Sequence, residues 1–130
     1  MAKKILIVDD DIEQIEFAST VLEENGYILI SATDGLEGME KVKSEKPDLI
    51  LLDILMPEKS GISMYREIRN DKESKDIPVI VVTGVGRGQR IEGRMMGQDP
   101  NIPAPEGFIQ KPMEPSVILK LVNKLLSGSS

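Results

Sequence analysis

Residues 5–10 read Ile5-Leu6-Ile7-Val8-Asp9-Asp10, an apolar run of four residues followed at once by carboxylates. A short apolar run without polar alternation is typical of a strand buried on both faces, as in a parallel sheet. Similar runs recur at residues 27–30, 49–52 and 79–82, and a weaker one at 108–110. These runs therefore predict five strands that form one buried sheet.

Amphipathic patterns separate these runs. Apolar residues recur at three- and four-residue spacing within residues 11–25, 35–46, 61–70 and 115–126, and each stretch predicts one helix. The positions expected to face the core are Ile12, Ile15, Ala18, Val21 and Leu22, then Leu36, Met39 and Val42, then Ile62, Tyr65 and Ile68, and last Val117, Ile118, Leu121, Val122 and Leu125. Asp34 is expected to cap the second helix, and Pro115 to open the last one.

Strands that alternate with helices in this way predict βαβ units with right-handed crossovers. We expect an α/β, flavodoxin-like, doubly wound sheet of five parallel strands in the order 2-1-3-4-5, with about five helices. The stretch 84–107 departs from the pattern, because nine of its 24 residues are Gly or Pro. That composition is unfavourable to a long helix. A fourth helix is expected to be short, near 89–96, in a segment that is mobile or only partly helical.

Composition limits the domain count and the possible chemistry. A chain of 130 residues is expected to form one domain over 1–130, with its core at about 3–126 and a tail at 127–130. The net charge of −6 argues against direct nucleic-acid binding, which calls for a basic surface. The absence of Cys and His excludes thiolate zinc sites, cysteine nucleophiles and imidazole acid–base chemistry. We find no signal peptide and no run of the roughly 18 apolar residues that span a membrane, so a cytoplasmic location away from membranes is expected.

The residues that follow the strands are the candidates for chemistry, because ligands of doubly wound sheets bind outside the carboxyl ends of the strands. Asp9 and Asp10 follow the first strand, Asp53 the third, Thr83 the fourth and Lys111 the fifth. Carboxylates about 4 Å apart repel by roughly 1 kcal/mol in water and about 4 kcal/mol near a protein surface. A cation would offset this repulsion by its positive charge. Mg²⁺ suits the position because it prefers oxygen ligands. With a phosphate also bound, a carboxylate can act as the nucleophile and form an aspartyl-phosphate.

Each of these residues also has a purely structural interpretation. The acidic run from Asp9 to Asp11 can cap the following helix. Asp53 can be a turn residue and Thr83 an ordinary strand residue. Lys111, which precedes a proline, is unremarkable by itself. The functional interpretation is favoured because all of these residues fall at one edge of one predicted sheet.

The same stretches carry a resemblance to the receiver domain of two-component response regulators, and it covers about residues 3–126. The motifs are Ile5-Leu6-Ile7-Val8-Asp9-Asp10, then Asp53-Ile54-Leu55-Met56-Pro57-Glu58-Lys59-Ser60-Gly61, then Val81-Val82-Thr83-Gly84, and last Phe108-Ile109-Gln110-Lys111-Pro112. The chain departs from the family between Thr83 and Lys111, where it is longer than usual and lacks the usual fourth helix.

The resemblance implies a role for each matching residue. Asp53 would be the phosphoacceptor. Asp10 would be the principal ligand of Mg²⁺, with Asp9 acting partly through a metal-bound water, and the backbone carbonyl of Leu55 would complete the protein ligands along with Asp53.

The remaining matches would respond to the phosphoryl group. Thr83 would hydrogen-bond it and move on activation. Lys111 would pair with it, and the Lys111–Pro112 bond is expected to be cis. Phe108 matches the aromatic switch position.

The function implied is a phosphorylation-switched signalling module of a phosphorelay, either a stand-alone regulator or a piece of a longer protein. Its donor would be a histidine kinase or a histidine phosphotransfer protein, because this chain lacks the histidine, and its output would be an unidentified protein. We do not expect an enzyme, since self-phosphorylation and self-dephosphorylation would be its only catalysis.

Two alternatives remain open. A receiver that signals without phosphate is favoured by the unusual 84–107 stretch and opposed by the full acidic set. A Mg²⁺-dependent phosphatase with an Asp nucleophile would usually carry a second Asp two residues later, where this chain has Leu55.

Overall fold

The computed structural model describes residues 2–53, 61–83, 104–110 and 114–127. Within these ranges the chain forms one sheet of five parallel strands in the order β2-β1-β3-β4-β5. The strands are β1 (Lys4–Val8), β2 (Ile28–Ala32), β3 (Leu49–Asp53), β4 (Val79–Thr83) and β5 (Gly107–Gln110). The predicted fold class and strand order are confirmed.

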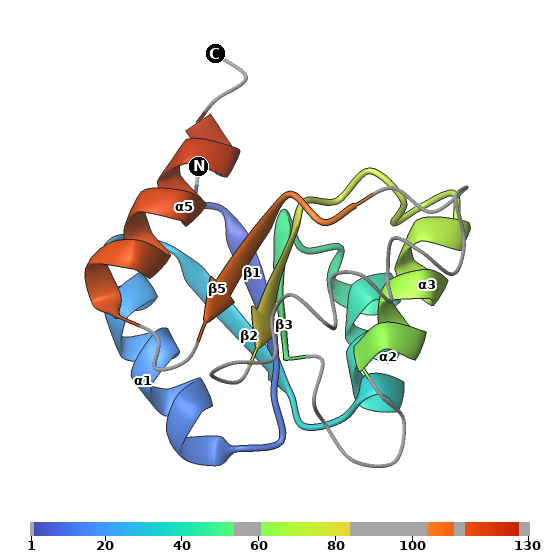
Figure 1. Ribbon diagram of the computed structural model, residues 1–130, viewed down its shortest axis with the longest axis horizontal. Helices are drawn as coiled ribbons and strands as arrows, with labels where there is room; N and C mark the ends of the chain where they lie inside the picture. The colour runs from blue at the N-terminus through green and yellow to red at the C-terminus, as the bar shows by residue number, and fades with distance from the viewer. Residues whose placement is uncertain (1, 54–60, 84–103, 111–113, 128–130) are drawn as a thin grey trace.

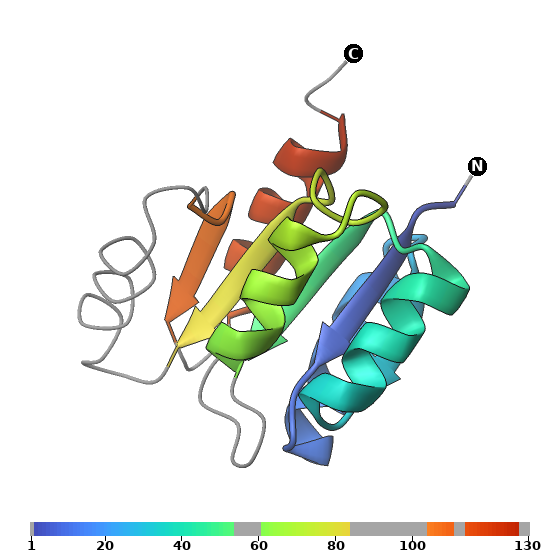
Figure 2. The same cartoon turned by 90° about the vertical axis from the view of Figure 1, so that its right-hand side faces the viewer.

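The described helices cover both faces of the sheet. They are α1 (Ile12–Glu23), α2 (Gly35–Glu45), α3 (Gly61–Asn70) and α5 (Pro115–Ser127). α1 and α5 lie on one face, and α2 and α3 on the other (Figure 1, Figure 2). The short fourth helix predicted near 89–96 lies outside the described residues. The predicted loop 84–107 extends one residue too far, because Gly107 already belongs to β5. A Cβ atom there would lie 2.8 Å from Cδ2 of Leu121, so the missing side chain lets α5 approach the strand.

The sheet separates two apolar layers. Alternate residues of β1 divide between them, as the pleat requires: Leu6 and Val8 pack with α2 and α3, while Ile5 and Ile7 pack with α1 and α5. β3 is buried along its whole length. Burial on both faces was wrongly predicted for β2, where Ile28 is 46% exposed. β2 is an edge strand with a neighbour on one side only.

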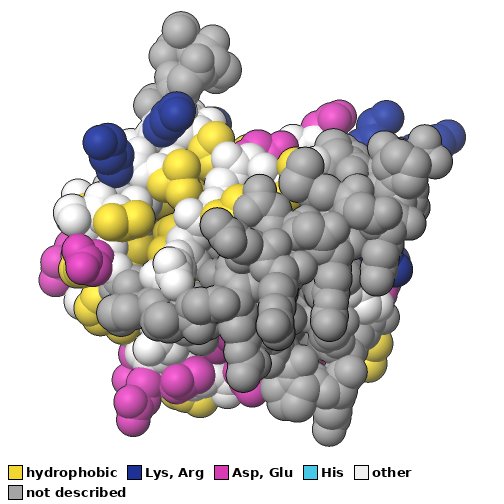
Figure 3. All heavy atoms as spheres, in the orientation of Figure 1, with side chains coloured by type: hydrophobic (Ala, Val, Ile, Leu, Met, Phe, Trp, Pro, Cys, Tyr) yellow, Lys and Arg dark blue, Asp and Glu magenta, His cyan; other side chains and the backbone are white. Residues whose placement is uncertain are grey.

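Three residues predicted to face the core are exposed instead: Ile12 (54%), Leu36 (63%) and Val117 (44%). Each lies in the first turn of its helix. Helical side chains point toward the helix N-terminus, so a side chain in the first turn extends past the end of the helix and away from the layer beneath. Figure 3 shows apolar side chains at the surface in the region of α5. The periodic pattern identified the apolar stripe but not where the stripe leaves the core.

The first turns of α1 and α2 are closed by aspartate caps. Asp34 accepts a hydrogen bond from the N–H of Glu37 at 2.8 Å, which confirms the predicted cap. The Glu37 carboxylate in turn accepts from the N–H of Thr33, the residue before the cap, at 2.8 Å, so two backbone donors at the start of α2 are satisfied. Asp11 caps α1 by accepting from the N–H of Glu13 at 3.0 Å. These caps fix where both helices begin beside the carboxyl end of the sheet.

Gly38 on α2 allows close packing against α3. A Cβ atom there would meet Cε and Sδ of Met64 at 2.7 and 2.8 Å, and Cγ2 of Val8 at 3.2 Å. Gly38→Val is expected to lower the free energy of unfolding by about 1–3 kcal/mol, because over-packing a filled core forces its neighbours to shift. Urea denaturation measures this, with Glu40→Val on the exposed side of α2 as the control for a β-branched residue in a helix. Equal midpoints for the two variants would contradict the packing argument.

Candidate functional site

Asp9, Asp10 and Asp53 come together at the carboxyl end of the sheet. Asp9 directly follows β1 and Asp53 ends β3. The two strands are paired so that Val8 lies opposite Leu52, which brings the next residue of each chain segment side by side. One carboxylate oxygen from each of the three aspartates lies within 4.8 Å of the others. The cluster predicted from the strand ends is therefore present.

The three aspartates differ in exposure. Asp9 and Asp53 are 2% and 4% exposed, whereas Asp10 is exposed. Asp9 is held from two sides, because its N–H donates to the carbonyl of Ala32 at 3.1 Å and its Oδ1 accepts from the N–H of Asp11 at 2.9 Å. Asp11 itself points its carboxylate at its own helix as the cap. The structural interpretation therefore holds for Asp11, whereas Asp9 and Asp10 contribute carboxylates to the cluster, and their role as a functional site stays a prediction.

The structure places the other predicted site residues only in part. Thr83 is the last residue of β4 and pairs in register with Gln110 of β5. Since Val82 lies opposite Asp53, the Thr83 backbone is at the same edge as the cluster, one strand away. Lys111 and Leu55 lie outside the described residues. Phe108 is half-buried and packs against the layer formed with α2 and α3, and its role as a switch stays a prediction.

The donor set suits a small divalent cation. Carboxylate oxygens this close repel one another, and burial of two of them strengthens the repulsion by lowering the local dielectric constant. Mg²⁺ prefers oxygen ligands and keeps several waters, so it needs only one or two protein carboxylates. Two buried acids with an exposed third would hold such an ion while leaving one side open to a phosphate.

Comparison with known proteins agrees with this geometry. The family model described as "Response regulator receiver domain" matches residues 5–123. The chain belongs to the receiver domain family of two-component response regulators. It is 32% identical to the protein PilH of Pseudomonas aeruginosa, over 96% of this chain and 98% of that one.

Other relatives of this receiver domain are longer. It is 32% identical to the alkaline phosphatase synthesis transcriptional regulatory protein PhoP of Bacillus subtilis, but spans about half of that protein's length. Among solved structures, a putative response regulator from Chloroflexus aurantiacus superposes with a TM-score of 0.84 at 26% identity, covering 98% of this chain and 99% of that one. The chemotaxis response regulator CheY4 of Vibrio cholerae superposes with a TM-score of 0.81 at 26% identity, covering 96% and 99%.

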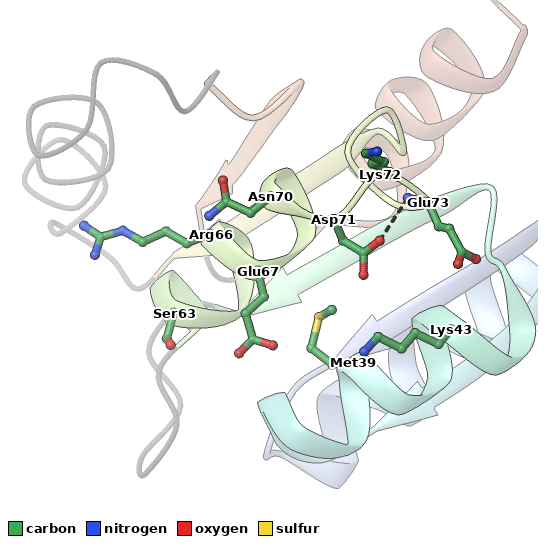
Figure 4. Close-up of a pocket in the computed structure, with 9 residues that line it drawn as sticks. All are labelled: Met39, Lys43, Ser63, Arg66, Glu67, Asn70, Asp71, Lys72 and Glu73. Carbon is green, nitrogen blue, oxygen red and sulfur yellow. Dashed lines mark hydrogen bonds between the residues drawn. The ribbon is translucent and has the colours of Figure 1, made fainter.

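A groove lies between α2 and α3 of this receiver domain (Figure 4). Its lining residues are Met39, Lys43, Ser63, Arg66, Glu67, Asn70, Asp71, Lys72 and Glu73. None of them is a predicted site residue, and charges of both signs alternate along it. The groove is therefore separate from the aspartate cluster.

Among the helices in the described ranges, we find none with the length and apolar character of a membrane span.

Mg²⁺ is expected to raise the melting temperature of this receiver domain. A ligand present at 100 times its dissociation constant stabilises the folded state by about 2.7 kcal/mol. Differential scanning fluorimetry with MgCl₂, against NaCl of equal ionic strength, measures the shift. Asp10→Asn is the informative variant, because it changes an exposed carboxylate of the cluster without disturbing the core. An equal shift in both salts, or in both proteins, would argue against a metal site at the cluster.

Proposed function

We propose that this receiver domain accepts a phosphoryl group on Asp53 from a phosphohistidine donor, with Mg²⁺ held by Asp9, Asp10 and Asp53. The observation that supports the proposal is the aspartate cluster itself, with carboxylate oxygens from the two residues that follow β1 and from the last residue of β3 within 4.8 Å of one another. Membership of the receiver family supports it independently.

The chemistry assigned to the chain is nucleophilic. An oxygen of the Asp53 carboxylate forms a bond to phosphorus as the phosphorus–nitrogen bond of the donor breaks, and the released imidazole takes a proton from water. Bound Mg²⁺ would supply positive charge that offsets the carboxylates and the phosphoryl oxygens. Lys111 and Thr83 are proposed to contact the phosphoryl group.

The partners follow from what the chain lacks. It contains no histidine, so the donor has to be another domain or protein, such as a histidine kinase or a histidine phosphotransfer protein. Phosphorylation would shift the population between two conformations of the surface near Phe108, and a protein would read that surface. We propose a cytoplasmic signalling role rather than an enzyme that turns over an external substrate, and no direct binding to nucleic acid.

Intact mass spectrometry after incubation with acetyl phosphate tests the proposal. Wild-type protein with Mg²⁺ is expected to gain the mass of one phosphoryl group, and peptide mapping should place it on Asp53. The same protein with the metal chelated is expected to gain none. An adduct elsewhere, or no adduct with either acetyl phosphate or a phosphorylated histidine kinase, would refute the proposed function.

A further inference from the structure

Arg69, in the last turn of α3, is a buried cation that joins several segments of the chain. Its side chain is 2% exposed. Its Nε donates to the hydroxyl oxygen of Tyr65 at 3.0 Å, and its Nη1 donates to the carbonyls of Lys75 and Ile77, both at 2.9 Å. Its Nη2 donates to the carboxylate of Glu106. One guanidinium therefore connects the end of α3, the segment before β4 and the residue before β5.

Glu106 extends this network into the sheet. Its Oε1 also accepts from the N–H of Val79 at 2.8 Å, while its own N–H donates to the carbonyl of Val79 at 3.0 Å. Val79 is the first residue of β4, so Glu106 fixes the amino ends of β4 and β5 relative to each other. Phe108 follows only two residues later.

Arg69 stays positively charged despite its burial. Burial alone would lower the pKa of the guanidinium, but hydrogen bonds to Tyr65 and Glu106 more than offset it, and the net shift is upward. For the Tyr65 phenol, burial has the opposite effect and raises the pKa, while the hydrogen bond and charge of Arg69 lower it by less. The hydrogen bond to Glu106 therefore has a charged donor, which places it in the stronger class of hydrogen bond.

We propose that the Arg69–Glu106 contact restrains the phosphorylation switch by coupling β5, and with it Phe108, to α3. This regulatory role rests on the proposed function of Asp53. The contact is formed in the unphosphorylated chain, so a movement of β5 away from α3 would lengthen it. An interaction present in one conformation and weakened in the other favours the first, and by linkage it opposes the modification that favours the second.

The contact lies at the opposite end of the strands from the aspartate cluster. Asp53 and Thr83 end β3 and β4, whereas Glu106 bonds to the residue that begins β4. Its variants therefore leave the proposed phosphorylation chemistry untouched, and a change in reactivity at Asp53 would report coupling.

Glu106→Gln tests the proposal. The amide keeps the shape and an acceptor for the Val79 N–H but removes the negative charge. Glu73→Gln is the matched control, because Glu73 is an exposed residue of the connection between α3 and β4. Intact mass gives the initial rate of adduct formation from acetyl phosphate, and hydrogen exchange gives the protection of the Gly107–Gln110 amides.

We expect Glu106→Gln to form the adduct about fivefold faster or more, at the lower end of typical coupling factors, with reduced β5 protection and no change in Glu73→Gln. Arg69→Lys keeps the cation with fewer donors and should fall in between. Reduced protection with an unchanged rate would show a purely structural role and overturn the proposal. If the wild-type protein forms no adduct, the proposed function fails. Hydrogen exchange then still tests whether β5 depends on the Arg69–Glu106 contact. Unchanged protection of β5 in Glu106→Gln would overturn the proposed restraint as well.

Discussion

Asp53→Asn is expected to abolish the phosphoryl adduct completely, whereas Asp11→Asn is expected to retain it. The two substitutions remove the same charge at the same end of the sheet. They differ because the Asp53 carboxylate belongs to the buried cluster, while the Asp11 carboxylate bonds to the N–H of Glu13. An amide oxygen at position 53 is a far weaker nucleophile than a carboxylate, so the phosphorus–oxygen bond should not form.

The control variant is chosen to preserve the fold. Asn is as good a cap as Asp, so Asp11→Asn should leave α1 intact. Intact mass after a fixed incubation with acetyl phosphate and Mg²⁺ compares the three proteins, and Mg²⁺ binding is checked in parallel. An adduct on Asp53→Asn would show that another group is the acceptor. Loss of the adduct in Asp11→Asn would show that the whole acidic run, and not the cluster, carries the reactivity.

The aspartate cluster could be predicted from sequence because it depends on topology alone. Four of the strands are short apolar runs, and with parallel strands in this order the residue after β1 and the last residue of β3 have to meet at one edge. For the acidic run Asp9 to Asp11, the sequence offered helix capping and a functional site as two alternatives and did not assign them to particular residues. The structure divides them between residues, since Asp11 caps α1 and Asp9 and Asp10 join the cluster.

The Arg69 cluster could not be predicted in this way. The partners of Arg69 are separated from it by between 4 and 37 positions in the sequence. Two of them are backbone carbonyls, which no residue type in the sequence indicates. An arginine at the end of an amphipathic helix is typical of a solvated residue that favours the helix C-terminus. Only the packing of α3 against the segment before β4 makes that arginine a buried one. Sequence patterns thus located features set by strand order, and missed those set by side chains reaching between distant segments.

Arg69→Met is expected to lower the free energy of unfolding by about 3–5 kcal/mol, as observed when one partner of a buried ion pair is removed. Methionine fills much of the space of the arginine stem, so the cost comes mainly from polar groups left without their donor. The carbonyls of Lys75 and Ile77 lose a hydrogen bond each, and Glu106 loses its cation. Because the Glu106 side chain is 37% exposed and can be hydrated, we expect a value near the lower end of the range.

Urea denaturation of Arg69→Met, Glu106→Gln and the double variant tests this energy as a cycle. If the pair acts as a unit, the second substitution removes a group that the first has already left without its partner. The double variant should then be more stable than the sum of the single effects predicts, by about 0.5–3 kcal/mol. Strict additivity would show that Arg69 stabilises the fold through its backbone acceptors and Tyr65, with Glu106 contributing only through Val79. That result would also remove the energetic basis for a restraint between α3 and β5, whereas a large coupling energy would give the restraint its measured strength.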